Sequence, residues 1–148
     1  MKKGNIILKT IGLLLVMVIF ITGCGNNNTQ EDYTEAMEEI RNTKFVILGD
    51  YTIGEYLDCA LTDAKWTEED NYTGDRGKGA VKVVGKDKNT GESIEILWVK
   101  EMTNGLKNES NIDYIIIDGE KTDSDAMAYT KYIQYLQKYK KDLDSAKE

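Results

Sequence analysis

Apolar and polar positions divide the chain into a leading apolar run, a short polar stretch and a longer mixed segment. Residues Ile11 to Ile21 are apolar apart from Gly12, and the basic residues Lys2 and Lys3 precede them. This arrangement is typical of a signal peptide, and the polar residues that follow would not enter a core. We expect a signal peptide over residues 1–23, a flexible spacer over residues 24–32 and an extracytoplasmic domain over residues 33–148.

Three stretches of the mixed segment show the spacing of amphipathic helices. The clearest begins at Thr52, whose hydroxyl can form a capping box with the carboxylate of Glu55, and it runs to Leu61 with an apolar stripe. A short helix is expected over Tyr33 to Asn42. A long one is expected over Asp123 to Leu143, because acidic residues lie near its start and lysines near its end.

Two segments alternate apolar and polar residues, as strands with one buried face do. They are Ala80 to Lys88 and Ser93 to Glu101, and Asn89-Thr90-Gly91 between them supplies a turn, so a β-hairpin is expected. Tyr114 to Ile117 is apolar on both faces. It is expected to be a central strand, or one covered by helices on one side and by a loop or partner on the other. Phe45 to Leu48 is expected to be a short buried strand or a segment pinned under the core.

The region between the capped helix and the hairpin is predicted to hold one aromatic anchor and a polar loop. Trp66 is expected to begin a strand and to cap the core rather than to serve as a ligand platform. Residues 68–79 are rich in acidic residues and glycine, which favours a loop. Neither this loop nor the Asp87-x-Asn89-x-Gly91 turn has the spacing of an EF-hand, so no metal or cofactor is expected.

Together these elements predict an α+β fold with a single antiparallel sheet of about four strands. The hairpin from Ala80 to Glu101 is expected at the centre of the sheet. The capped helix from Thr52 to Leu61 and the long C-terminal helix from Asp123 to Leu143 are expected to pack against it.

The junction Ile21-Thr22-Gly23-Cys24 resembles the lipobox of bacterial lipoproteins, which is an aliphatic residue, a small residue, glycine or alanine, and a cysteine. In that family the cysteine thiol accepts a diacylglyceryl group and the cysteine becomes the first mature residue. The resemblance implies that acylated Cys24 anchors the protein in the lipid bilayer, on the extracytoplasmic face of the cell membrane. The alternative is a permanent transmembrane helix, but such a helix needs about 20 apolar residues.

Charge and composition narrow the function further. The whole chain has a net charge of −7, and removal of Lys2, Lys3 and Lys9 with the leader leaves 16 basic and 26 acidic residues, a net charge of −10. Such a surface repels nucleic acid, so no nucleic-acid partner is expected. Histidine is absent, and acylation of Cys24 would leave a single thiol, so neither a zinc site nor a disulfide framework is expected. Cys59 is interpreted as a small residue beside the core rather than a reactive thiol.

A second resemblance covers residues 45–120. The segments Thr52-Ile53-Gly54-Glu55-Tyr56-Leu57-Asp58, Lys65-Trp66 and Val81-Lys82-Val83-Val84-Gly85 are similar to a small α+β domain found in lipoproteins and membrane-anchored proteins of Gram-positive bacteria. Members of that family are mostly of unassigned function, so the resemblance implies no catalytic residues. The layout is more distantly similar to β-lactamase-inhibitor-like and outer-membrane-assembly lipoprotein domains, which bind other proteins; this is an analogy of fold alone.

The C-terminal helix carries a row of tyrosines that is a candidate interface. Tyr132, Tyr135 and Tyr139 extend over more than one face of that helix, so not all of them are expected to enter the same core. Exposed tyrosines are typical of protein interfaces. The alternative interpretation is that the rings shield the edge of the core and keep their hydroxyls in water.

No function class is specified by a motif. The sequence lacks histidine, a Gly-x-Ser-x-Gly motif and a phosphate-binding glycine loop, so an enzyme is not expected. The favoured hypothesis is a membrane-tethered domain that binds another protein, whose identity the sequence does not give, at the outer face of the membrane. The alternatives are a structural accessory of an envelope, secretion or conjugation assembly, and a domain that captures a small solute.

Overall fold

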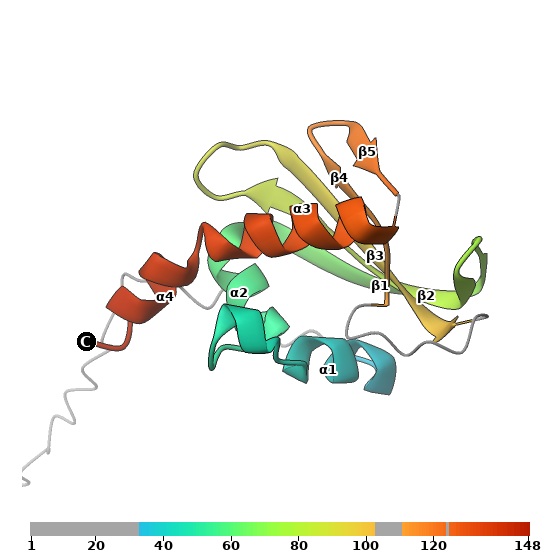
Figure 1. The fold of residues 1–148 in the computed structure, drawn as a ribbon, viewed down its shortest axis with the longest axis horizontal. Coiled ribbons are helices and arrows are strands. Elements are labelled where there is room, and N and C mark those ends of the chain that lie inside the picture. Colours follow the sequence, from blue (N-terminus) through green and yellow to red (C-terminus); the bar gives the residue numbers. More distant parts are fainter. Residues whose placement is uncertain (1–32, 103–110, 124) are drawn as a thin grey trace, which may run out of the picture.

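A computed structural model describes residues 33–102, 111–123 and 125–148 of the protein (Figure 1). Helices precede, and helices follow, a run of consecutive strands. In chain order the elements are α1 (Glu35–Asn42), the 3-10 helix η1 (Val46–Leu48), α2 (Ile53–Ala60), β1 (Leu61–Thr73), β2 (Gly77–Asp87), β3 (Ser93–Met102), β4 (Ile112–Ile117), β5 (Glu120–Thr122), α3 (Asp125–Gln137) and α4 (Lys140–Ser145).

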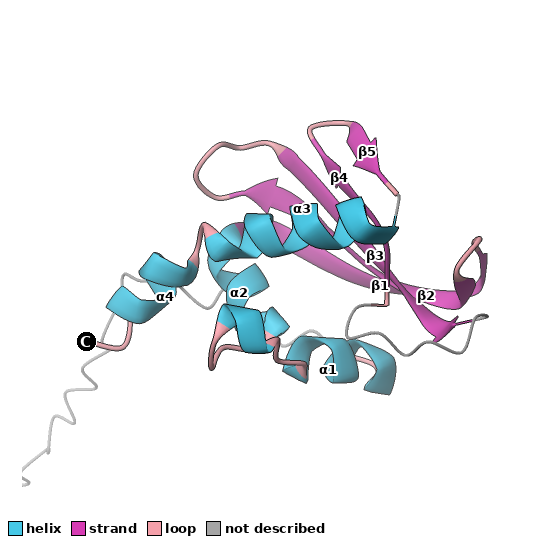
Figure 2. Ribbon diagram, in the orientation of Figure 1, coloured by secondary structure: helices cyan, strands magenta, loops and turns pink. Residues whose placement is uncertain are grey.

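The strands form one antiparallel sheet in the order β1-β2-β3-β4-β5, so every strand pairs with its neighbour in the chain. The expected α+β fold is therefore confirmed, with five strands instead of about four. The expected hairpin is formed by β2 and β3, with Val83 opposite Ile96. The helices and the sheet form two layers, with α3 lying across the strands (Figure 2).

The prediction of a loop over residues 68–79 is wrong except at residues 74–76, because β1 continues to Thr73 and β2 begins at Gly77. β1 is an edge strand, and its side chains beyond Trp66 are exposed or only partly buried. A strand in that position can carry polar residues on both faces, so its composition resembles that of a loop. The sheet also gains β5, a three-residue strand that pairs with the end of β4.

The capping box of α2 is confirmed. The Thr52 amide donates to the Glu55 carboxylate (2.7 Å), and the Glu55 amide donates to the Thr52 hydroxyl (3.2 Å). These two bonds satisfy amides that have no partner inside the helix. The predicted apolar stripe is buried along its whole length, at Ile53, Tyr56, Leu57, Ala60 and Leu61.

The single C-terminal helix expected from Asp123 to Leu143 is wrong, because the chain breaks it into α3 and α4. At the break, the Lys138 and Tyr139 amides donate to carbonyls three residues back, at Tyr135 and Leu136. Such tight turns shift the direction of the following helix. Tyr139 at the break and Leu143 in α4 are both buried in the core.

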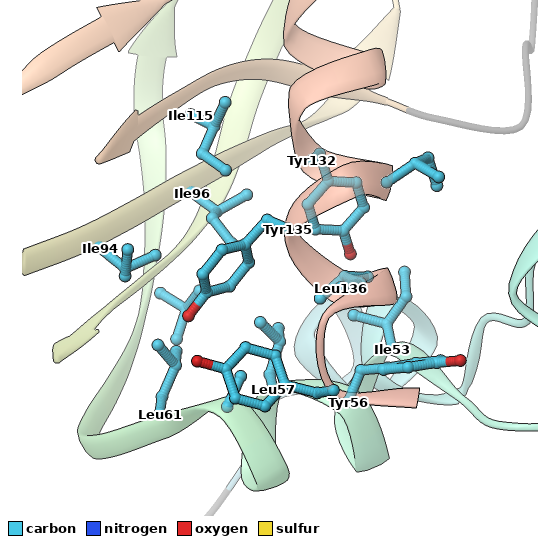
Figure 3. Packing of buried hydrophobic residues seen from close by; sticks show 14 of the residues in the cluster. Ile53, Tyr56, Leu57, Leu61, Ile94, Ile96, Ile115, Tyr132, Tyr135 and Leu136 are labelled. Carbon is cyan, nitrogen blue, oxygen red and sulfur yellow. The ribbon is translucent and has the colours of Figure 1, made fainter. Parts of the chain in front are cut away.

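One large core fills the space between the helix layer and the sheet (Figure 3). β3 contributes Ile94, Ile96 and Trp98, while α2 and α3 contribute rings and leucines that face them. The segment Phe45 to Leu48, expected as a strand or a pinned segment, is η1; Phe45 and Leu48 are buried in this core. In the described part of the chain, no helix is long and apolar enough to cross a membrane.

Candidate functional site

The tyrosines predicted as an interface lie in the core instead. Tyr132, Tyr135 and Tyr139 are 0%, 1% and 2% exposed, and Figure 3 shows the first two pointing from α3 toward the sheet and α2. The expectation that one core could not hold them all is wrong because the core is wide. The Tyr132 ring packs in edge-to-face contacts with the rings of Phe45 and Trp98, whose centres lie 6.2 and 6.0 Å from its own. Aromatic side chains from three parts of the chain therefore share one layer.

Tyr139 reaches a buried carboxylate at the turn between β2 and β3. Its hydroxyl donates to Asp87, which is 3% exposed and also accepts the Asn89 and Thr90 amides at 2.9 Å each. Burial alone would raise the pKa of Asp87, but these hydrogen bonds to the ionised form outweigh it and hold the pKa below 3.8. Asp87 therefore fixes the hairpin turn and joins it to the C-terminal segment.

A second aromatic group joins α1 to the sheet. The Arg41 guanidinium lies 4.4 Å from the centre of the Tyr33 ring and 5.2 Å from that of Trp66, and it forms two hydrogen bonds with the Asp58 carboxylate (2.7 and 3.2 Å). Trp66 stacks on Trp98 with ring centres 5.7 Å apart. Trp66 is half-buried and packs against the core, as expected. These contacts are explained by packing and need no ligand.

The opposite side of the sheet differs, and we call it the open face. It is formed by side chains that alternate with those of the large core. Its floor is a small buried cluster of Ala80, Leu97 and Val99, against which Tyr72 and Tyr114 pack. In the described part of the chain, no helix contributes to this cluster. The partly or largely exposed members of the open face are Glu69, Tyr72, Lys82, Val84, Glu95, Tyr114, Ile116 and Lys121.

The curl of the sheet brings the far end of the β1–β2 pair to the start of β4. The Tyr72 hydroxyl donates to the Asp113 carboxylate, and the Arg76 guanidinium donates to the carbonyl oxygen of Ile112. β1 and β4 are not neighbours in the sheet, so these hydrogen bonds connect parts of the sheet that are not paired with each other. They hold Tyr72 over the floor of the open face.

Hydrogen bonds also fix the middle of the open face. The Tyr114 hydroxyl donates to Glu95 (2.6 Å), and the ammonium of Lys121 lies 4.6 Å from the centre of the Tyr114 ring. Burial and the neighbouring carboxylates raise the pKa of Tyr72 and of Tyr114. Both phenols therefore stay protonated at neutral pH, and their hydrogen bonds orient the two rings.

The open face carries several lysines, although the protein as a whole is acidic. Lys65 and Lys86 are exposed on the same side as Lys82 and Lys121, and Lys82 forms an ion pair with Glu69. Bonding to Glu69 raises the pKa of Lys82, so its charge is secure. In the described residues, no group of three acidic or cysteine side chains is placed to hold a metal ion.

The structure describes one of the two cysteines. Cys24, the predicted lipid acceptor, lies outside the described residues. Cys59 is buried on α2, as expected, but it is disulfide-bonded. The expectation that Cys59 has no disulfide partner was conditional on acylation of Cys24, and the structure differs from it in this respect.

Sequence reasoning missed the open face as a site, although one signal was present. Ile116 and Tyr114 belong to the strand that was apolar on both faces, and the structure covers only one of its sides with helices. The chain matches no known family model, and no curated protein or solved structure is significantly similar to it.

Proposed function

We propose that the protein is a lipoprotein anchored through acylated Cys24 at the extracytoplasmic face of the cell membrane, and that its domain binds another protein through the open face. The observation that carries the binding proposal is the open face itself. It combines half-exposed Tyr72 and Tyr114 with the exposed aliphatic side chain of Val84, which is 37% exposed, on the side of the sheet away from the helices.

The composition of the open face fits an interface. Tyrosine contributes a large contact area at low entropic cost, because it has few rotatable bonds. The rings of Tyr72 and Tyr114 are already fixed by Asp113 and Glu95, so binding would not need to order them. Pre-ordered aromatic side chains beside an apolar floor are the groups that dominate binding energy in protein complexes.

The charge of the open face indicates the kind of partner. The side chains on this side include five lysines, Lys65, Lys78, Lys82, Lys86 and Lys121, and four acidic residues, Glu69, Glu95, Glu101 and Asp113, whereas the whole chain has a net charge of −7. Lys65 lies opposite Val84, and Lys82 and Lys86 lie two residues from it along β2. Complementary charge speeds association and excludes partners of like charge. We therefore expect a partner with an acidic rim around an apolar centre.

The binding proposal is tested by proximity labelling of the native protein on living cells, followed by substitution of the open face. Val84→Asp should abolish labelling of the partner, because it places a charge in the apolar centre of the interface. Met127→Asp is the matched control, since Met127 is 65% exposed on α3 and lies outside the open face. Equal labelling by the wild-type and Val84→Asp proteins would contradict the proposal.

The anchor is tested separately. Cys24→Ala should abolish lipid attachment and either release the protein from the membrane fraction or leave the leader uncleaved, and the intact mass of the wild-type protein should include a diacylglyceryl thioether. The mass also decides between lipidation and a disulfide that uses the same sulfur, because one sulfur atom cannot form both bonds. An unmodified Cys24 in a membrane-bound protein would refute the anchor.

A further inference from the structure

The tip of η1 exposes two adjacent aliphatic side chains. Val46 is 93% exposed and Ile47 is 61% exposed, while Phe45 and Leu48 on either side are buried. The tip is held firmly, because the Leu48 amide donates to the Phe45 carbonyl (2.9 Å) and the Tyr56 hydroxyl donates to the Leu48 carbonyl (2.7 Å). Two neighbouring apolar side chains on a fixed turn form a protrusion and not a disordered loop.

Lysines and the exposed Asp50 lie beside this protrusion. Lys44 is exposed two residues before Val46, and the Lys140 side chain of α4 lies against Gly49, where an added Cβ would be 3.9 Å from its Cε. The ammonium of Lys147 lies 3.9 Å from the centre of the Tyr51 ring. Asp144 pairs with Lys140 (3.1 Å) and accepts from the Tyr51 hydroxyl (2.9 Å), so part of the charge is balanced locally. Exposed aliphatic side chains such as those of Val46 and Ile47, with lysines beside them, suit an anionic lipid surface.

The position of the protrusion in the chain is compatible with contact to the membrane. The expected spacer from Cys24 to residue 32 has nine residues and can extend at most about 30 Å. The eight residues of α1 that follow rise about 12 Å, and η1 begins four residues later. A bilayer that holds an acyl chain on Cys24 is therefore within reach of Val46 and Ile47.

We propose that Val46 and Ile47 enter the headgroup region of the same bilayer that holds the lipid anchor. This inference rests on the anchor proposed above. Lipid is favoured over a protein partner because the protrusion is small and purely aliphatic, and because Lys44 and Lys140 lie beside it. η1 belongs to the helix layer, so this contact would turn the helices toward the membrane and leave the open face directed outward, where a partner can reach it.

Site-specific photo-crosslinking tests the contact in the full-length chain. Benzoylphenylalanine replaces Ile47, Met127 or Val84 in separate proteins made in a host that processes lipoproteins. Position 47 should gain the mass of a phospholipid, position 127 should gain none above background, and position 84 should crosslink to protein. The lipid adduct should be lost in the Cys24→Ala background. If the Ile47 variant accumulates poorly, the same probe at Val46 repeats the test.

The outcomes separate the two proposals. An acylated protein that gives protein adducts, or no adducts, at positions 46 and 47 overturns the membrane contact and leaves the anchor intact. Lipid adducts at position 47 without protein adducts at position 84 support the contact and argue against the binding face. A wild-type protein whose mass shows no acyl group overturns both the anchor and the contact that rests on it.

Discussion

Tyrosines on the two sides of the sheet have opposite environments. On the helix side, Tyr132 is completely buried, and its hydroxyl has no hydrogen-bond partner among the described residues. On the open face, Tyr72 and Tyr114 are only partly buried, and each hydroxyl donates to a carboxylate. The Tyr132 ring contributes packing, whereas the hydroxyls of Tyr72 and Tyr114 fix their rings at the surface. The same residue type therefore stabilises the core on one side and shapes a candidate interface on the other.

The largest difference between the two sides should follow from removing a ring. Tyr132→Ala leaves a cavity next to Phe45 and Trp98 and should lower the free energy of unfolding by about 3–5 kcal/mol. Tyr114→Ala should cost clearly less, because its ring is partly in water. Urea denaturation of both variants measures the difference. Equal losses would mean that the open face is packed as tightly as the core.

An intermediate effect is expected where Tyr139 meets Asp87. Tyr139→Phe removes a donor from a buried carboxylate and should cost about 1.5–3 kcal/mol at neutral pH. The fold holds the pKa of Asp87 below its unfolded value of 3.8, so the stabilisation is present above that pH and is lost as the pH falls through the folded pKa. The variant and the wild-type protein should therefore converge in stability toward low pH, as pH-dependent urea melts will show. A difference that stays constant from neutral pH down to the pH of acid unfolding would contradict this assignment.

The smallest change in the free energy of unfolding should come from removing the hydroxyl of Tyr72 or of Tyr132, and its sign should differ between the two sides of the sheet. Tyr72→Phe loses the bond to Asp113 and should destabilise the protein by about 0.5–1.5 kcal/mol. Tyr132→Phe removes a buried hydroxyl without a partner among the described residues, so it should be neutral or stabilising. Thermal melts of the two variants under identical conditions provide the comparison. A loss on Tyr132→Phe that equals the loss on Tyr72→Phe would show that the buried hydroxyl is bonded in solution.

Local signals in the sequence predicted those elements whose determinants lie close together in the chain. The Thr52–Glu55 capping box and the turn at Asn89-Thr90-Gly91 each involve a few consecutive residues, and both form as expected. The break before Lys140 could not be predicted in that way. At this break the Tyr139 hydroxyl donates to Asp87, which is 52 residues away in the chain, and no local pattern shows that contact.

The candidate site was harder to predict than the fold. Its residues come from all five strands, and Tyr72 lies in a segment whose composition resembled that of a loop. The tyrosines of α3 were the more obvious interface because their spacing wraps around the helix. Only the three-dimensional structure shows that α2, η1 and the sheet enclose them.

The neighbour-only order of the strands determines how the domain can assemble. A chain that emerges from its N-terminus can pair each strand with the one before it, so the sheet can be complete before residues 125–148 appear. Its hydrophobic side, with Ile94, Ile96 and Ile115, then stays in contact with water until α3 docks. The C-terminal segment is therefore the last part of the chain that can cover this side, and a chain cut short after β5 would leave these apolar side chains in water.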